Sequence, residues 1–294
     1  MAVKPFLKWA GGKGQLLGAI RAKYPAELGA DVTKYAEPFV GGGAVLFDIL
    51  ESYRLNEIYI SDINRELILT YTTLSDNADA LIAALSDMER AYLSASEEAR
   101  KAMYYAKRDR FNALKTERSE SVELAALFVF LNKTCFNGLY RVNAKGAFNV
   151  PQGSYRNPTI CDADNLRAVS EKLQGVTIVC GDYALSRGFI DEHTFAYFDP
   201  PYRPLTATSS FTAYSQDGFG DAEQTELARF IDEMTERGAW VVASNSDPKN
   251  ADENDDFFDR LYRRHTITRI DATRAINSIS SGRGRVSELL IARG

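Results

Sequence analysis

Short β-rich runs alternate with longer segments of helical period along most of this chain of 294 residues. Five such runs, each followed by a helix or a loop, are residues 34–38, 57–62, 176–182, 194–201 and 239–245. The alternation is typical of an open parallel sheet with helices on both faces, and we expect the last three runs to be buried. Residues 262–270 and 286–292 close the chain as two further strands, which we expect to pair as an antiparallel edge.

The alternation stops between about residues 65 and 165, where three long stretches have helical period. The Gly- and Asn-rich segment 137–155 follows them and predicts a β-hairpin, with Ala144, Lys145 and Gly146 near its turn. We therefore predict a helical insertion carrying a hairpin, set into an α/β sheet domain. The predicted boundaries are 1–64 and 163–294 for the sheet domain and 65–162 for the insertion.

Composition excludes several protein classes. The 45% hydrophobic and 26% charged residues describe an ordinary globular protein, and the longest apolar runs, such as 124–131, are too short to span a bilayer. The N-terminus lacks the apolar region of a secretion signal. Three scattered cysteines favour a reducing cytoplasm over a disulfide framework. With two histidines and no Cys/His cluster, we expect no metal site.

The net charge of −5 does not indicate a nucleic-acid binder, but the charges are unevenly spread. Residues 1–24 and 131–160 carry basic side chains and no acid, and residues 260–294 carry eight arginines against two acids. These segments could form solvated faces, or they could line a basic cleft that attracts a polyanion. Charge alone favours the solvated faces.

A glycine loop, Gly41–Gly43, lies where the first predicted strand turns into a helix. Glycines there let the backbone approach a ligand, although Leu46 takes the last glycine's place in G-x-G-x-x-G. A tight strand–helix turn is the alternative for the glycine loop. Asp62 ends the next strand, where an acid can bind two ribose hydroxyls, and a helix N-cap is the alternative for Asp62. Glu37 beside the loop is unfavourable for phosphates and acceptable for a sulfonium, which indicates S-adenosylmethionine over NAD.

The stretch FAYFDPPY, residues 195–202, ends a predicted buried strand at Asp199. The two prolines remove amide donors, so that Asp199 and the Pro200 carbonyl can both accept hydrogen bonds from an exocyclic amine. Tyr202 can stack on the ring that bears the amine. This arrangement suits methyl transfer to an aromatic amine, and a base in a duplex must be flipped out to reach it. A plain Asp-Pro turn is the weaker alternative.

Together these residues resemble the Dam-type DNA adenine-N6 methyltransferases, the alpha-class D12 family with a Rossmann-like methyltransferase sheet and an inserted target-recognition domain. The segments that carry the resemblance are 6–13, 37–47, 61–64, 130–155, 181–183, 199–202 and 286–291. The resemblance implies S-adenosylmethionine as cofactor, double-stranded DNA as partner and no obligate protein partner. The amino-acid sequence of the hairpin implies GATC as the target. Tyr140, Val142 and the turn 143–147 depart from the family pattern, so the identity of the outer bases stays open.

The resemblance also implies roles for individual residues. The implied catalytic residues are Asp199, Pro200, Pro201 and Tyr202. The implied cofactor-binding residues are Trp9, Lys13, Glu37, Pro38, Phe39, Gly41, Asp62, Asp182 and Tyr183. The implied DNA-facing residues are Lys8, Asn137, Leu139, Arg141, Asn143, Pro151 and Tyr155. A core position is the alternative for Trp9, and a phosphate contact is the alternative to base reading for Arg141.

The polar, aromatic segment 203–220 follows the catalytic turn, and we expect a lid over DNA with Phe211 and Tyr214 as contacts; the alternative is a loop with no role. Other functions stay open beside DNA methylation. An amino-methyltransferase acting on RNA or on a protein glutamine is the alternative. An NAD-dependent oxidoreductase is disfavoured by the incomplete glycine pattern and by the Asp-Pro-Pro-Tyr motif. A DNA-binding regulator without catalysis is disfavoured by the intact cofactor and catalytic motifs. Whether a restriction enzyme accompanies the chain is left open by the sequence.

Overall fold

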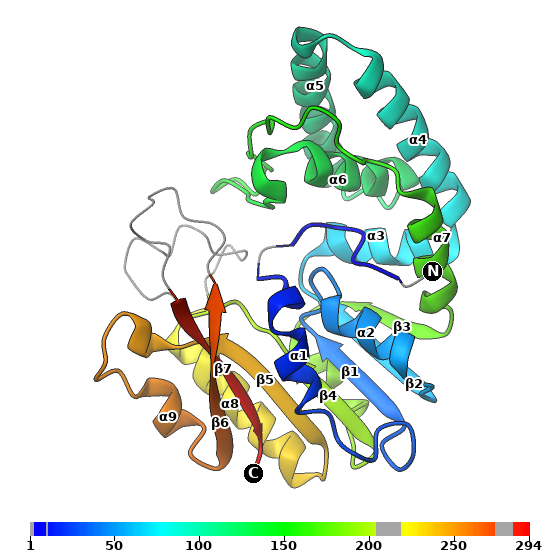
Figure 1. The fold of residues 1–294 in the computed structure, drawn as a ribbon. Helices are drawn as coiled ribbons and strands as arrows, with labels where there is room; N and C mark the ends of the chain where they lie inside the picture. The colour runs from blue at the N-terminus through cyan, green and yellow to red at the C-terminus, as the bar shows by residue number, and fades with distance from the viewer. Residues whose placement is uncertain (1–2, 10, 204–218, 274–284) are drawn as a thin grey trace. The chain divides into compact units, whose positions relative to one another are not determined.

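The structure is a computed structural model that describes residues 3–9, 11–203, 219–273 and 285–294 (Figure 1). In this part of the chain seven strands form one sheet, flanked by helices, in the order β3-β2-β1-β4-β5-β7-β6. The strands are β1 Lys34–Pro38, β2 Glu57–Asp62, β3 Val176–Cys180, β4 Thr194–Phe198, β5 Trp240–Ser246, β6 His265–Thr273 and β7 Arg285–Arg293. The predicted α/β class with a Rossmann-like methyltransferase sheet is confirmed.

Strand directions follow the expected pattern at the centre and at one edge of the sheet. β1, β4 and β5 are parallel neighbours, whereas β7 pairs antiparallel with both β5 and β6. All five residues of β4 are buried, as expected for a central strand with sheet neighbours on both sides. The residues that follow the parallel strands β4 and β5 therefore lie at the same edge of the sheet.

The prediction that residues 176–182 form a buried strand is wrong in two respects. β3 ends at Cys180, and its side chains are half-buried or exposed. The reason is its place at the end of the strand order, where it has one strand neighbour. An apolar run shows that a strand forms, but its neighbours decide how far it is buried.

The chain divides into two compact units. The first comprises Met1–Gly12, Val40–Ser52 and Ser61–Gly181, and the second comprises Lys13–Phe39, Tyr53–Ile60 and Asp182–Gly294. The helices of the first unit are α2 Ala44–Ser52, α3 Arg65–Asp76, α4 Ala78–Ser94, α5 Glu97–Thr116, α6 Val122–Thr134, η2 Phe136–Gly138 and α7 Ala163–Leu173. Those of the second are η1 Lys13–Gln15, α1 Leu17–Arg21, η3 Tyr183–Gly188, α8 Asp221–Glu236, η5 Pro248–Asn250 and α9 Phe257–Leu261. The functional division at residues 65 and 162 remains a prediction.

The helical part of the first unit is built around α6. Ser121 caps this helix by accepting a hydrogen bond from the Leu124 amide, and the apolar run 124–131 is buried all round. A helix that is apolar on every face belongs in a core, so the run serves packing. The described helices include none with both the length and the apolar composition that crossing a membrane requires.

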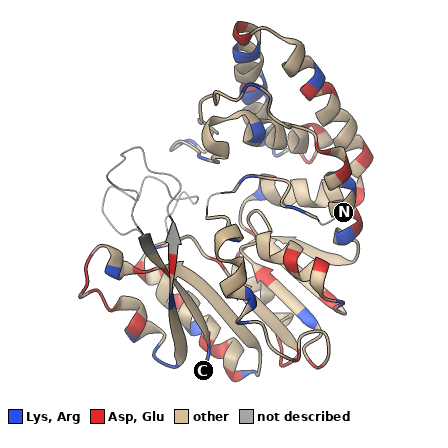
Figure 2. Cartoon of the chain, in the orientation of Figure 1, with Lys and Arg blue, Asp and Glu red and all other residues tan. Residues whose placement is uncertain are grey.

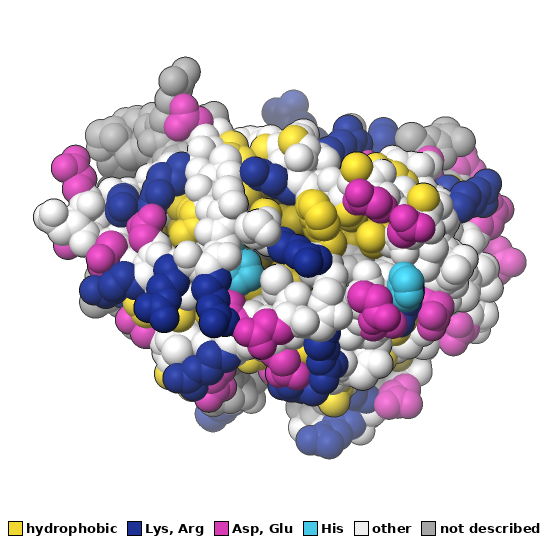
Figure 3. Space-filling view, turned by 90° about the horizontal axis from the view of Figure 1, so that it is seen from below, with side chains coloured by type: hydrophobic (Ala, Val, Ile, Leu, Met, Phe, Trp, Pro, Cys, Tyr) yellow, Lys and Arg dark blue, Asp and Glu magenta, His cyan; other side chains and the backbone are white. Residues whose placement is uncertain are grey.

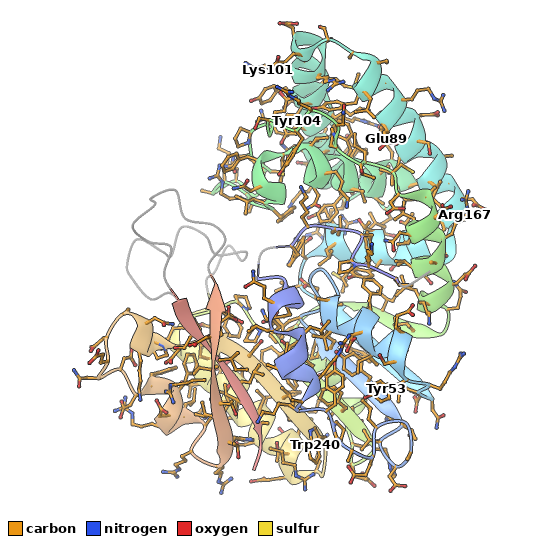
Figure 4. The ribbon with its side chains drawn as sticks, in the orientation of Figure 1. Tyr53, Glu89, Lys101, Tyr104, Arg167 and Trp240 are labelled. Carbon is orange, nitrogen blue, oxygen red and sulfur yellow. The ribbon has the colours of Figure 1, made fainter. Side chains whose placement is uncertain are left out.

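The predicted hairpin over 137–155 forms a turn without a continuous ladder. Two isolated antiparallel bridges, Cys135 with Gln152 and Val142 with Phe148, hold the segment. Backbone hydrogen bonds from the Asn143 amide to Ala147 and from the Asn149 amide to Arg141 join the two arms of the segment. Side chains of α5 bind other backbone groups: Asn112 bonds both the amide and the carbonyl of Phe148, and the hydroxyl of Tyr104, which is labelled in Figure 4, donates to the Val150 carbonyl at 2.8 Å. α5 therefore satisfies backbone groups that the two arms do not satisfy for each other.

Candidate active site

Asp199 directly follows β4, as the sequence predicted, and both of its carboxylate oxygens have partners. Oδ2 lies 2.7 Å from the Lys13 ammonium nitrogen, and Oδ1 accepts a hydrogen bond from the Ser244 hydroxyl at 2.8 Å. Ser244 lies near the end of β5, beside β4, and its hydroxyl is 3.0 Å from that of Tyr197. A carboxylate has about four lone-pair sites, so Asp199 can accept further hydrogen bonds while it keeps these two.

Lys13 lies against Asp199 and Tyr202. Its side chain is 5% exposed, and its nitrogen lies 4.8 Å from the centroid of the Tyr202 ring. The Tyr202 hydroxyl donates to Glu288 at 2.8 Å. Burial, and then the nearby Asp199 and Glu288 carboxylates, raise the pKa of Tyr202 well above its usual value, so the phenol stays neutral. One amine nitrogen is therefore held between a carboxylate and an aromatic ring.

Three contacts of the catalytic turn were not predicted from the sequence, those of Lys13, Ser244 and Glu288. Lys13 was expected to bind the cofactor, and the structure places it on Asp199; its cofactor role remains a prediction. Ser244 and Glu288 were not singled out. The available signal for Ser244 was the polar run that ends β5, because the carboxyl ends of neighbouring parallel strands share a sheet edge.

Glu37 and Phe39 lie at the end of β1. Glu37 is buried and accepts a hydrogen bond from the Tyr35 hydroxyl at 2.7 Å. Phe39, directly after Pro38, has φ of 133°, a conformation that is costly for a residue with a side chain. Its half-buried ring stacks on Tyr183 with centroids 5.6 Å apart. Backbone strain at such a position is a feature that clusters at ligand sites.

Asp182 and Phe219 complete the surroundings of that ring pair within the second unit. The exposed Asp182 begins η3, where its carboxylate accepts a hydrogen bond from the Ala184 amide at 2.9 Å. Phe219, which precedes α8, meets the Phe39 ring edge-on at 6.0 Å. Three rings from separate segments thus contact one another, those of Phe39, Tyr183 and Phe219. Phe219 was not predicted to belong to the site.

In the first unit, Asp62 binds the glycine loop. Its carboxylate accepts hydrogen bonds from the amides of Gly41 at 3.1 Å and Asn64 at 2.9 Å. The alternative of a helix N-cap at Asp62 is wrong, because the Asn64 side chain caps α3 by accepting from the Leu67 amide. Burial raises the pKa of Asp62 to about 6. The carboxylate therefore fixes the loop and changes protonation in a mildly acidic range.

Trp9 explains why position 41 is glycine. Gly41 has φ of +47°, and a Cβ there would lie 2.7 Å from the Trp9 Cδ1 atom. Trp9 also stacks on Tyr140, with centroids 6.0 Å apart, and is half-buried. It therefore has the packing role considered for it, and its role in cofactor binding remains a prediction.

Three of the predicted DNA-facing residues lie in a chain of contacts around η2. The Lys8 ammonium lies 4.1 Å from the centroid of the Tyr155 ring, and Lys8 exchanges backbone hydrogen bonds with the buried Asn132 side chain. A Cβ on Gly138 would come within 2.6 Å of the Lys8 Cβ, so glycine is required there. Asn137, in η2, is exposed with φ of 55°. Beside it, the aromatic ring of Phe136 is 51% exposed, and no sequence motif marks this residue.

The remaining predicted DNA-facing residues follow along the hairpin segment. Arg141 is exposed, and its Nε donates to the Asn149 side chain at 2.8 Å, which holds the guanidinium in place. Asn143 caps the turn by accepting from the amides of Lys145 and Ala147. Leu139 is half-buried, and the exposed Pro151 accepts from the Phe136 amide. Asn143 thus has a structural role whatever it binds.

Charge is distributed as the sequence indicated along the hairpin segment, which carries Lys and Arg and no acid (Figure 2). On the face drawn in Figure 3, Lys and Arg side chains lie among Asp and Glu side chains, as on a solvated surface. Among the described residues, no group of His, Cys, Asp and Glu side chains is placed to hold a metal ion. Phe211 and Tyr214, the predicted lid contacts, lie outside the described residues.

Comparisons with known proteins agree with the motifs over nearly the whole chain. Residues 9–276 match the family described as D12 class N6 adenine-specific DNA methyltransferase. The chain is 48% identical to the Type II methyltransferase M.MjaIII of Methanocaldococcus jannaschii, over 99% of both chains. It is 35% identical to the Type II methyltransferase M1.LlaDCHI of Lactococcus lactis, covering 98% of this chain and 95% of the relative. The DNA adenine methylase of Escherichia coli K12 is 33% identical, covering 98% of this chain and 94% of the relative.

These matches confirm the family that the motifs indicated, and with it an enzyme that acts on DNA. The incomplete glycine pattern and the Asp-Pro-Pro-Tyr turn both fit this family, whereas neither favours a hydride-transferring enzyme. The chain therefore belongs to the D12 class of N6 adenine-specific DNA methyltransferases, enzymes that take their methyl group from S-adenosylmethionine.

Proposed function

We propose that this enzyme methylates the adenine of GATC in double-stranded DNA after that adenine has turned out of the duplex. One observation carries the proposal for the catalytic turn. The Lys13 nitrogen lies 2.7 Å from the Asp199 carboxylate and 4.8 Å from the centre of the Tyr202 ring. A nitrogen donor at this position meets an acceptor and a stacking surface at once, which is what an adenine amine requires.

Asp199 and Tyr202 would act on the amine in different ways. The lone pair of the adenine N6 atom is delocalised into its ring, so N6 is a weak nucleophile. A hydrogen bond to Asp199 draws an amine hydrogen toward the carboxylate, which localises the lone pair on N6 and stabilises the positive charge that develops on nitrogen. S-adenosylmethionine, when bound, supplies an electrophilic methyl group. As N6 forms its new bond to the methyl carbon, the bond between that carbon and sulfur would break and its electron pair would stay on sulfur, which leaves as a neutral thioether. The positively charged N6 is acidic, and it returns to neutrality by losing a proton to Asp199 or water.

Each unit, taken by itself, has side chains whose chemistry suits groups of the cofactor. In the second unit, the buried Glu37 carboxylate suits a sulfonium or ammonium charge, and the rings of Phe39 and Tyr183 suit an adenine. In the first, Asp62 has the acceptor oxygens that ribose hydroxyls need. The implied cofactor-binding residues Trp9, Lys13, Glu37, Pro38, Phe39, Gly41, Asp62, Asp182 and Tyr183 are therefore kept as a proposal.

Sequence reading is proposed for the hairpin segment. Arg141 is exposed and held by Asn149, so its guanidinium keeps a fixed fork that can bind guanine O6 and N7 together. Lys8, Asn137, Leu139, Asn143, Pro151 and Tyr155 are proposed to face DNA beside it. The adenine must leave the duplex because its amine is otherwise buried in a base pair, out of reach of a protein carboxylate.

Methyl transfer to defined oligonucleotides tests this function. Purified protein with methyl-labelled S-adenosylmethionine should label a duplex that contains GATC. A matched duplex with GTTC, single-stranded RNA and a glutamine peptide should stay unlabelled. With 2-aminopurine in place of the target adenine, fluorescence should rise on binding as the base unstacks. Equal labelling of the GATC and GTTC duplexes would contradict the specificity, and labelling of RNA or peptide alone would contradict DNA as substrate.

A further inference from the structure

The backbone of the catalytic turn is held by two buried amide side chains that no motif singles out. Gln224, in the first turn of α8, donates from Nε2 to the Pro201 carbonyl at 3.0 Å. Its Oε1 accepts from the Asn245 side chain on β5, also at 3.0 Å. Asn245 Oδ1 in turn accepts from the backbone amide of Arg203 at 3.3 Å. The two amides therefore connect the residues on either side of Tyr202.

The direction of these hydrogen bonds is fixed by their ends. Asn245 Oδ1 faces two backbone amides, those of Arg203 and Ser246, so it must be the acceptor. The Asn245 NH₂ group must then face Gln224, whose oxygen accepts and whose NH₂ group points at the Pro201 carbonyl. Neither amide can be reversed without placing two donors or two acceptors against each other in a buried site.

Burial makes the arrangement rigid. Gln224 is 0% exposed and Asn245 is 1% exposed, so water cannot replace a lost partner. α8 packs against β5, which places both side chains on regular elements (Figure 1). The prolines at 200 and 201 have no amide donor, so the turn itself offers few groups by which the protein could hold it.

We infer that Gln224 and Asn245 are positioning residues for methyl transfer, which fix the Asp199–Tyr202 turn so that acceptor and stacking ring meet the target amine together. Gln224 binds the Pro201 carbonyl and so fixes its direction, while the Asp199 carboxylate and the Pro200 carbonyl are the acceptors proposed for the amine. The inference rests on the proposed function, because it assigns the turn to the reacting base. Neither residue touches the substrate, and both act through Pro201 and Arg203.

The test is the single-turnover methylation rate of Gln224→Met, which keeps the side-chain length and removes both hydrogen bonds. A small displacement of a reacting group costs about 10²-fold in rate, so we expect a fall of about 10- to 100-fold. The dissociation constants for S-adenosylmethionine and DNA, and KM for DNA, should stay at the parent's values. A residue that only supported folding would lower the amount of active protein and leave the rate per active site unchanged.

Asn165→Asp is the matched control, because Asn165 is a buried amide on α7 that bonds the backbone of Lys4 and not the backbone of the turn. It should keep the parent's rate per active site. If Gln224→Met fails to fold, Asn245→Asp takes its place: it keeps an acceptor for Arg203, but its second oxygen faces Gln224 Oε1, so the donor that orients Gln224 is lost. A parent rate in the folded variant overturns this inference alone. Absence of adenine methylation by the parent protein overturns the proposed function instead.

Discussion

Replacement of Asp199 by alanine separates chemistry from binding most sharply. The variant loses the hydrogen-bond acceptor for the amine, and removal of one such group from a preorganised site typically costs about 2.7–4 kcal/mol, or about 10²–10³ in kcat. In the proposed mechanism this carboxylate contacts the amine alone, so affinity for S-adenosylmethionine and for the DNA backbone does not depend on it. We therefore expect the methylation rate to fall by at least that factor, with both dissociation constants largely unchanged.

The same substitution should also lower stability, because Lys13 and Ser244 lose their partner. Removing one member of a buried ion pair costs about 3–5 kcal/mol. Lys13 is 5% exposed but the Asp199 side chain is 21% exposed, so solvent screens part of the interaction. About 1–3 kcal/mol is a reasonable expectation for the loss in the free energy of unfolding.

The assay compares single-turnover rates at saturating cofactor and duplex DNA, with denaturant unfolding measured on the same preparations. Asp191→Ala is the matched control: Asp191 pairs with Lys34 at 2.9 Å in the same unit, before the opposite end of β4. It should lose some stability and keep the parent's rate. If Asp199→Ala methylates DNA within a few-fold of the parent, the role given to Asp199 is refuted.

Three further predictions concern the cofactor, the base and the sequence. Burial raises the pKa of Asp62 to about 6, so affinity for S-adenosylmethionine should be full above that pH and fall by up to about tenfold per pH unit below it. Calorimetry that shows the same affinity at about pH 7.5 and at about pH 5 would exclude Asp62 as the ribose ligand. Tyr202→Phe keeps the ring and loses the hydrogen bond to Glu288, so its rate should stay near the parent's. Tyr202→Ala should lose about 5- to 150-fold, since stacking of a base is worth about 1–3 kcal/mol, and equal rates for the two variants would rule out stacking. Arg141→Ala should lose about 1–3 kcal/mol of discrimination at one base pair, measured as methylation rates on singly altered duplexes at fixed salt; an equal loss on every duplex would make it a phosphate contact.

The strands were predictable because their signal is local. A run such as 194–198 is apolar from end to end, and the acid that follows it lies at the carboxyl end of a parallel strand in every such sheet. Asp199 could therefore be placed before the structure was known. Burial of a strand is not local in this sense, which is why β3 was misjudged as buried when it lies at the sheet edge.

The sequence gives no spacing between Asp199 and its partners, because they come from distant parts of the chain. Lys13 belongs to a short 3-10 helix and Ser244 to β5, and no spacing relates them to each other. Asp62 shows a different limit. Asp62 and Asn64 both suit an N-cap, and only the backbone path shows that Asn64 takes this role while Asp62 turns to Gly41.

The most direct test of adenine methylation is to map N6-methyladenine in plasmid DNA from a host that lacks adenine methylases and expresses this chain. The account predicts methyladenine on both strands of GATC sites, and none in plasmid from cells that express Asp199→Ala. Plasmid DNA without methyladenine, from cells with folded parent protein, would contradict the account.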